Sequence, residues 1–167
     1  FLHTESGFYF MKITLIQVGK TNEKYLEEGI SNYVGRLTHY ADFSVTTLPE
    51  LKNAKSLSIE QQKEKDTETI LKSLEPNDEI ILLDEKGKEF TSTEFAGYME
   101  KKMTSTRKRI VFVIGGPFGF SQKIYDMAHG KISISRMTFS HQMIRLLFVE
   151  QLYRAFTIIK GEHYHHE

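Results

Sequence analysis

The chain has 167 residues, enough for one domain, and its 22 Lys+Arg balance 22 Asp+Glu, so any nucleic-acid-binding role must rest on a local basic patch. It contains no cysteine, which excludes disulfides, thiolate zinc sites and cysteine nucleophiles and fits the reducing cytoplasm, where we expect the protein. No apolar run approaches the roughly 20 residues that cross a bilayer, so we expect no membrane partner.

Residues 1–10 precede the first methionine, Met11. They lack the basic start and the small-residue cleavage site of a signal peptide. We expect these ten residues to be an N-terminal extension that is not native, followed by a single domain over residues 11–167. A genuine N-terminal arm is the alternative.

The first half of the chain alternates strand and helix patterns. Apolar residues follow helical spacing from Leu26 to Leu37, and a Lys- and Glu-rich segment over 59–74 predicts an exposed helix. A polar loop is expected between residues 49 and 58, and a turn at 85–88. Short β-branched or alternating runs predict strands at residues 12–18, 43–48 and 79–84.

The second half continues this alternation. Thr91 and Glu94 form a capping-box pattern for a helix that runs to about residue 103. Ser121 is placed to cap a short helix that begins at residue 122. Further strands are predicted at residues 110–114 and 131–135, and a last helix at 140–160. The whole chain therefore predicts an α/β fold with a mostly parallel sheet flanked by helices.

The last predicted helix has no continuous polar face, because Leu146 to Val149 are apolar around a whole turn. Such a helix lies deep in its domain or packs against a second copy. We favour a two-fold homodimer, the commonest oligomer. Glu150 and Arg154 have the spacing of an intrahelical ion pair, which we expect in preference to a base role for Glu150.

Three segments fall at strand ends that a parallel sheet brings together. The strand over 110–114 runs into Gly115, Gly116 and Pro117, a sharp turn at the edge where open α/β sheets bind ligands. The loop over 134–139 mixes backbone donors, hydroxyls and apolar side chains, which suit an adenine edge and a thioether, and Leu83 ends a third strand. The alternative for the glycine turn is a purely structural role. The alternative for the loop over 134–139 is an ordinary strand-to-helix connection.

Two other segments carry charge. Residues 101–109 include five basic side chains, which indicate ordinary surface at a helix end or an RNA contact. Three histidines in residues 161–167 suggest a metal site, but we expect a loose solvated tail and no metal.

The motifs together resemble the ribosomal large subunit pseudouridine methyltransferase H family, small knotted enzymes of the SPOUT superfamily. The resemblance rests on Val-Ile-Gly-Gly-Pro-x-Gly at 113–119, Ser-x-Met-Thr-Phe-x-His-Gln-Met-x-Arg at 135–145 and Glu-Gln-x-Tyr-Arg-Ala-x-x-Ile-x-x-Gly-Glu-x-Tyr-His at 150–165. Met-Lys-Ile-Thr at 11–14 and Leu-Asp-x-x-Gly-Lys at 83–88 extend it from Met11 to the end. It implies a SPOUT-type fold with a C-terminal trefoil knot, a rare exception among protein topologies.

The resemblance also implies S-adenosylmethionine as methyl donor and methylation of N3 of a pseudouridine in a 23S rRNA hairpin, on assembled ribosomes, by a homodimer. Carried over by position, the donor site comprises Leu83, Gly115, Gly116, Ile134, Ser135, Arg136, Met137, Thr138 and Phe139. Three positions depart from the family pattern. Ser140 replaces a proline, His166 replaces a basic residue and Phe118 stands where a polar or acidic residue is common.

Methylation at N3 requires loss of the N3 proton, for which we expect His165 to act as base or Arg154 to stabilise the developing anion. RNA contacts are expected from Arg145, Arg154, Lys160, Tyr164 and His165, with Arg136 and the 101–109 segment as further candidates. Pairing within the helix or across a dimer is the alternative for Arg145 and Arg154. Rival functions are a non-catalytic ribosome- or RNA-binding protein and a nucleotide-binding α/β protein with another ligand.

Overall fold

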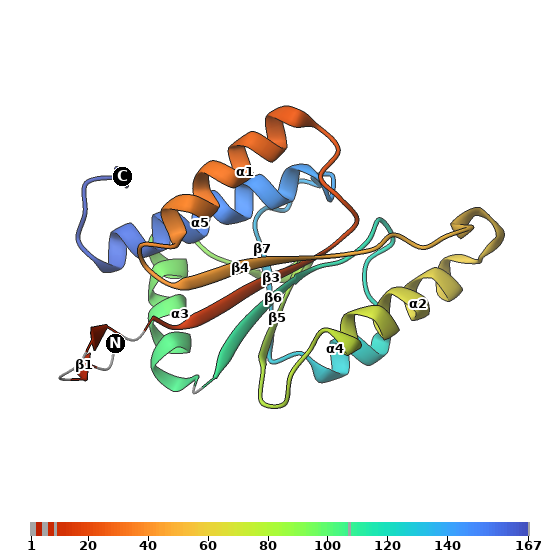
Figure 1. Ribbon diagram of the computed structural model, residues 1–167, viewed down its shortest axis with the longest axis horizontal. Helices are drawn as coiled ribbons and strands as arrows, with labels where there is room; N and C mark the ends of the chain where they lie inside the picture. Colours follow the sequence, from red (N-terminus) through yellow and green to blue (C-terminus); the bar gives the residue numbers. More distant parts are fainter. Residues whose placement is uncertain (1–2, 5–6, 9, 107, 167) are drawn as a thin grey trace.

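The computed structural model describes residues 3–4, 7–8, 10–106 and 108–166 (Figure 1). Its centre is a sheet of five strands in the order β4-β3-β6-β5-β7, and every neighbouring pair is parallel. The strands are β3 (Lys12–Val18), β4 (Asp42–Leu48), β5 (Glu79–Glu89), β6 (Arg109–Ile114) and β7 (Gly130–Ser133). The predicted α/β class with a parallel sheet is confirmed.

Helices cover both faces of the sheet. They are α1 (Lys24–Leu37), α2 (Ile59–Lys72), α3 (Ser92–Ser105), α4 (Gln122–Met127) and α5 (Met143–Ile159). In Figure 1, α1, α3 and α5 lie on one face, and α2 and α4 lie on the other. A short 3-10 helix, η1 (Ala54–Ser56), interrupts the predicted loop before α2. Separately, β1 (His3–Thr4) and β2 (Gly7–Phe8) form a small antiparallel pair.

The middle strand, β6, is buried along its whole length. Side chains alternate between the two faces of a strand, so β6 contributes to two separate hydrophobic clusters. Phe112 belongs to the cluster under α1, α3 and α5, and Val111 and Val113 belong to the cluster under α2 and α4. The β-branched run that predicted this strand is therefore explained by burial on both faces.

The predicted turn at 85–88 is wrong, because β5 continues to Glu89. After an irregularity that follows Leu83, the strand pairs with β7 again, at Lys88 with Ile132 and at Glu89 with Ser133. A Cβ at Gly87 would lie 2.6 Å from the backbone carbon of Ile132. Glycine therefore permits a close approach of the two backbones that any side chain would prevent.

The ends of the last elements also differ from expectation. Strand β7 stops at Ser133, two residues before the predicted end. Ser121 occupies the N-cap position of α4, but its side chain does not cap the helix. Its hydroxyl instead shares a 2.5 Å hydrogen bond with the hydroxyl of Thr67 on α2.

Helix α5 begins at Met143, where the Ser140 hydroxyl accepts a hydrogen bond of 3.1 Å from the Met143 backbone N–H. The helix packs against α1 and α3. Its buried residues, among them Phe148, Leu152 and Phe156, belong to the cluster on that face of the sheet. Much of its apolar surface is thus covered within one chain, whereas Leu146 and Leu147 are only half-buried. No helix in the described part of the chain combines the length and apolar character of a membrane span.

Candidate active site

A cavity of about 740 Å³ lies at the carboxyl ends of β5, β6 and β7. This volume is within the range of roughly 300–1,000 Å³ found for small-molecule sites. Leu83 from β5, Gly116 after β6 and Thr138 after β7 all line it, although they are far apart in the sequence. Strands β6 and β7 end here, and the pairing of β5 with β6 stops at Leu83, so the three segments converge at one edge of the parallel sheet.

The structure brings together most of the residues that were assigned to the donor site. The cavity is lined by Leu83, Gly115, Gly116, Ile134, Ser135, Met137, Thr138 and Phe139. Arg136 does not line it. Its side chain is 86% exposed and its Nε lies 3.7 Å from Glu89 Oε1.

Hydrogen bonds within the loop over 134–139 hold it against β5. The Ser133 hydroxyl donates to the Ser135 carbonyl at 2.9 Å, and the Met137 backbone N–H donates to the Ser135 hydroxyl at 2.9 Å. The Thr138 hydroxyl donates to Glu85 Oε2 at 3.3 Å. The loop is therefore fixed by its own serines and by a carboxylate of the neighbouring strand.

The glycine turn after β6 is a tight, hydrogen-bonded turn. The Gly119 backbone N–H donates to the Gly116 carbonyl at 3.1 Å, with Pro117 and Phe118 at the two corners. Gly119 has a φ of 79°, a left-handed conformation that glycine adopts readily. A Cβ at Gly116 would lie 2.8 Å from Asp66 Oδ2, so α2 is docked closely against this turn.

Several cavity residues were not identified as candidates from the sequence, and four of them carry ionisable side chains that matter for the site. These four are Lys63, Asp84, Tyr125 and His141. Asp84 and His141 fall inside the family motifs and could have been found there. Lys63 gave no signal, because it lies in a helix whose charges suggested ordinary exposed surface.

Two of these residues, Asp84 of β5 and Tyr125 of α4, form a hydrogen-bonded pair. The Tyr125 hydroxyl donates to Asp84 Oδ2, and the Lys86 backbone N–H donates to Asp84 Oδ1 at 2.8 Å. Burial and this hydrogen bond to Asp84 raise the pKa of Tyr125 above its usual value. The phenol therefore stays protonated as a donor, and it holds a carboxylate at the cavity wall.

The structure contradicts the expectation that Arg145 binds an RNA phosphate. Its side chain is 0% exposed, and its guanidinium donates to the Val18 carbonyl at 2.8 Å and to the Gly19 carbonyl at 3.0 Å. It also donates to the Thr21 hydroxyl at 3.1 Å and to the His141 carbonyl at 3.0 Å. Arg145 therefore connects the start of α5 to the end of β3 and is inaccessible to a phosphate.

His141 lines the cavity just before the start of α5, and its backbone carbonyl accepts a hydrogen bond from Arg145. Burial lowers the pKa of its imidazole, and the Arg145 charge lowers it further, while Glu50 acts in the opposite direction. A neutral imidazole is therefore favoured at this position near neutral pH.

The C-terminal residues are not a loose tail, as the sequence suggested, but fold back onto α1 and α5. Tyr164 shares a hydrogen bond of 3.1 Å with the Tyr33 hydroxyl and packs edge-on against Tyr153 at 4.7 Å between ring centroids. Arg154 Nη1 lies 3.2 Å from His165 Nδ1. The predicted pair of Glu150 and Arg154 is confirmed, with 2.5 Å between Oε1 and Nη2.

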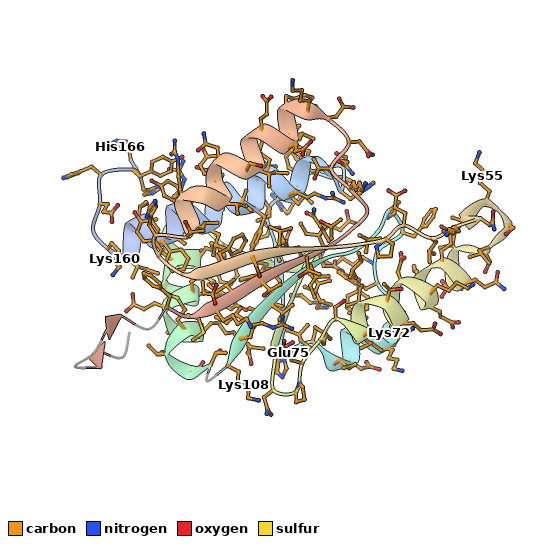
Figure 2. The ribbon with its side chains drawn as sticks, viewed as in Figure 1. Lys55, Lys72, Glu75, Lys108, Lys160 and His166 are labelled. Atoms are coloured by element: carbon orange, nitrogen blue, oxygen red, sulfur yellow. The ribbon has the colours of Figure 1, made fainter. Side chains whose placement is uncertain are left out.

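This tail cluster is remote from the cavity within one chain. Helix α5 has 17 residues and leads from the cavity edge toward the chain terminus, a span of about 25 Å. Figure 2 shows Lys160 and His166 at one end of the molecule and Lys55 at the other. Arg154 and His165 therefore lie together, but apart from the cavity. No cluster of potential metal ligands occurs among the described residues.

Comparison with known proteins identifies the family. A family model described as "Predicted SPOUT methyltransferase" matches residues 11–165. The chain belongs to this family. Proteins named ribosomal RNA large subunit methyltransferase H from Bacteroides fragilis and Phocaeicola vulgatus are each 60% identical over 157 residues, which is 94% of this chain and 100% of the relative. The resemblance inferred from the motifs is confirmed.

A third relative of the same name, from Parabacteroides distasonis, is 59% identical over the same shares of both chains. A crystal structure described as a probable methyltransferase from Bordetella pertussis Tohama I matches with a TM-score of 0.52 and 12% identity, over 88% of this chain and 95% of that one. This structural match supports the α/β fold alone. The trefoil knot stays a prediction of the family resemblance.

Proposed function

We propose that this chain transfers a methyl group from S-adenosylmethionine to N3 of a pseudouridine in 23S rRNA, on ribosomes in the cytoplasm. The observation that carries the proposal is the convergence of Leu83, Gly116 and Thr138 on one cavity. The relatives are named as methyltransferases of large-subunit ribosomal RNA, which supports the substrate class.

The cavity residues fit this donor. Leu83, Ile132 and Ile134 offer apolar walls that suit a purine ring, and the carboxylates of Asp84 and Glu85 suit the donor's ammonium and sulfonium charges. When bound, S-adenosylmethionine supplies a methyl group made electrophilic by its sulfonium. The protein's main task is then to hold the attacking nitrogen and the methyl carbon in line and to exclude water.

We infer that a complete site needs two copies of the chain. Arg154 lies about 16 Å along α5 from its first residue, and His165 lies beside it, so we infer that they act on a nucleotide in the cavity from a second copy. In such a homodimer, His165 would accept the N3 proton or Arg154 would stabilise the developing negative charge. Lys160, which is exposed, and Tyr164 would add RNA contacts from the same tail.

The decisive experiment combines donor binding with analysis of the RNA. Isothermal titration of the purified protein with S-adenosylmethionine should give saturable one-to-one binding per chain. Mass spectrometry of 23S rRNA from cells that lack the protein should show one pseudouridine without its methyl group, restored by the wild-type gene. Absence of donor binding would favour a non-catalytic ribosome-binding protein. Binding without methyl transfer to ribosomes would favour a nucleotide-binding protein of another kind.

A further inference from the structure

Phe118 is an apolar residue with no place in the core. It occupies a corner of the turn after β6, lines the cavity and is 45% exposed. Pro117 precedes it, and the bond from Gly119 to Gly116 closes the turn, so the backbone that carries the ring is rigid. A large aromatic ring held at a cavity mouth in this way is preorganised to contact a ligand.

Helix α2 places a lysine beside this turn. Asp66 and Thr67 make the contacts of α2 with the turn, through Gly116 and Ser121 respectively. Lys63 lies one helical turn earlier on the same face and lines the cavity. Its side chain is 25% exposed, and its Nζ is 3.6 Å from the exposed Glu60 carboxylate, an ion pair that a stronger anion can replace.

Further apolar and basic side chains line the same cavity, together with the carboxylates of Asp84 and Glu85. Phe139 is 41% exposed, Met137 is exposed, and Lys86 adds a second exposed cation. Aromatic rings beside lysines suit a nucleotide, because the base can stack on a ring while the phosphate meets a positive charge. The mouth is continuous with the donor cavity, so a base bound there would face the methyl group.

We propose that Phe118 and Lys63 bind the acceptor nucleotide, with the pyrimidine stacked on the Phe118 ring and its phosphate paired with Lys63. This inference rests on the proposed methyl transfer. A base in an RNA hairpin must leave its stack to enter a cavity, and stacking on Phe118 compensates part of that cost. Both residues position the substrate and neither takes part in proton transfer.

The test uses the full-length protein and large ribosomal subunits from cells that lack it. We expect Phe118→Leu, which keeps an apolar side chain but removes the ring, to weaken binding of the subunits about tenfold and to raise KM similarly. Phe118→Trp should retain affinity. Lys63→Gln should weaken binding and reduce the slope of log affinity against log salt by about 0.7. Lys65→Gln, at an exposed position of α2 that does not line the cavity, is the matched control.

Titration with S-adenosylmethionine separates this inference from its alternatives. Unchanged donor affinity in Phe118→Leu supports it, whereas a loss of donor affinity means that the ring packs on the donor and overturns it. A shift from dimer to monomer in analytical ultracentrifugation of Phe118→Leu would assign the ring to a subunit interface and would also overturn it. Wild-type affinity for ribosomal subunits in both Phe118→Leu and Lys63→Gln removes this inference alone. If the wild-type protein binds no donor, the proposed function itself fails.

Discussion

At the scale of single residues, Arg145 shows how a charged side chain can become part of the core. A buried charge is costly unless hydrogen bonds replace its water, and four polar groups accept from this guanidinium. Three of these acceptors are backbone carbonyls, which stay in place if the side chain is removed. Burial lowers the pKa of Arg145 from its usual value, while the charge of Glu50 acts in the opposite direction.

We predict that Arg145→Met lowers the free energy of unfolding by about 2–4 kcal/mol, because the Val18 and Gly19 carbonyls lose their donors while buried. Urea unfolding with an unchanged m-value measures the loss. Arg136→Met, at an exposed position, should stay within about 0.5 kcal/mol of the wild type. An Arg145→Met protein as stable as the wild type would show that water can replace the guanidinium.

At the scale of elements, the approach of β5 to β7 positions the loop over 134–139. The two strands pair on both sides of an irregularity, and Gly87 lies against the Ile132 backbone. Strand β7 leads directly into the loop that lines the cavity. A displacement of β7 therefore alters the cavity as well as the sheet.

We expect Gly87→Ala to destabilise the protein by about 1–3 kcal/mol, because its Cβ would lie 2.6 Å from an Ile132 backbone atom that cannot move alone. It should also weaken binding of S-adenosylmethionine, measured by isothermal titration. The matched control is Gly97→Ala in the interior of α3, where a Cβ has no heavy atom within 4 Å. That change should stabilise the protein by about 0.5–1 kcal/mol, as alanine does in helices. Equal effects of the two substitutions would contradict the close-approach argument.

At the scale of the whole molecule, the cavity and the tail cluster lie at opposite ends of α5. In Figure 1 the chain terminus lies away from the sheet edge where the strands end. The tail is nevertheless ordered by the contacts of Tyr164 with Tyr33 and Tyr153. A preformed tail remote from its own cavity is the arrangement that a two-subunit site requires.

A heterodimer of two defective chains tests this arrangement. Thr138→Trp should block the donor cavity, Arg154→Ala should disable the tail, and each homodimer should be inactive. Co-expressed with different tags and purified on both, the mixed dimer has one intact composite site out of two, so we predict about half of the wild-type activity per dimer. An inactive mixed dimer would place all functional groups in one chain. Failure to recover any doubly tagged protein would exclude the dimer.

Much of the fold could be predicted because local patterns and burial agree. The alternation over 12–18 and the apolar run of β6 predicted strands whose residues are indeed buried, and the Thr91–Glu94 capping box is present as expected. The turn at 85–88 was wrong because polar residues and a glycine also suit an edge where two backbones meet closely. Local sequence does not record which backbone lies opposite a glycine.

By itself the sequence determined the α/β class, the family and part of the cavity lining, because each depends on short motifs and on which strand ends they follow. Only the tertiary structure decided that Arg145 is buried, that the tail is docked and that Lys63 lines the cavity. These outcomes depend on contacts between residues more than 50 positions apart, such as Arg145 with Val18, Tyr164 with Tyr33, and Thr67 with Ser121. The spacing of residues along one segment carries no information about such contacts, because packing of the whole chain creates them.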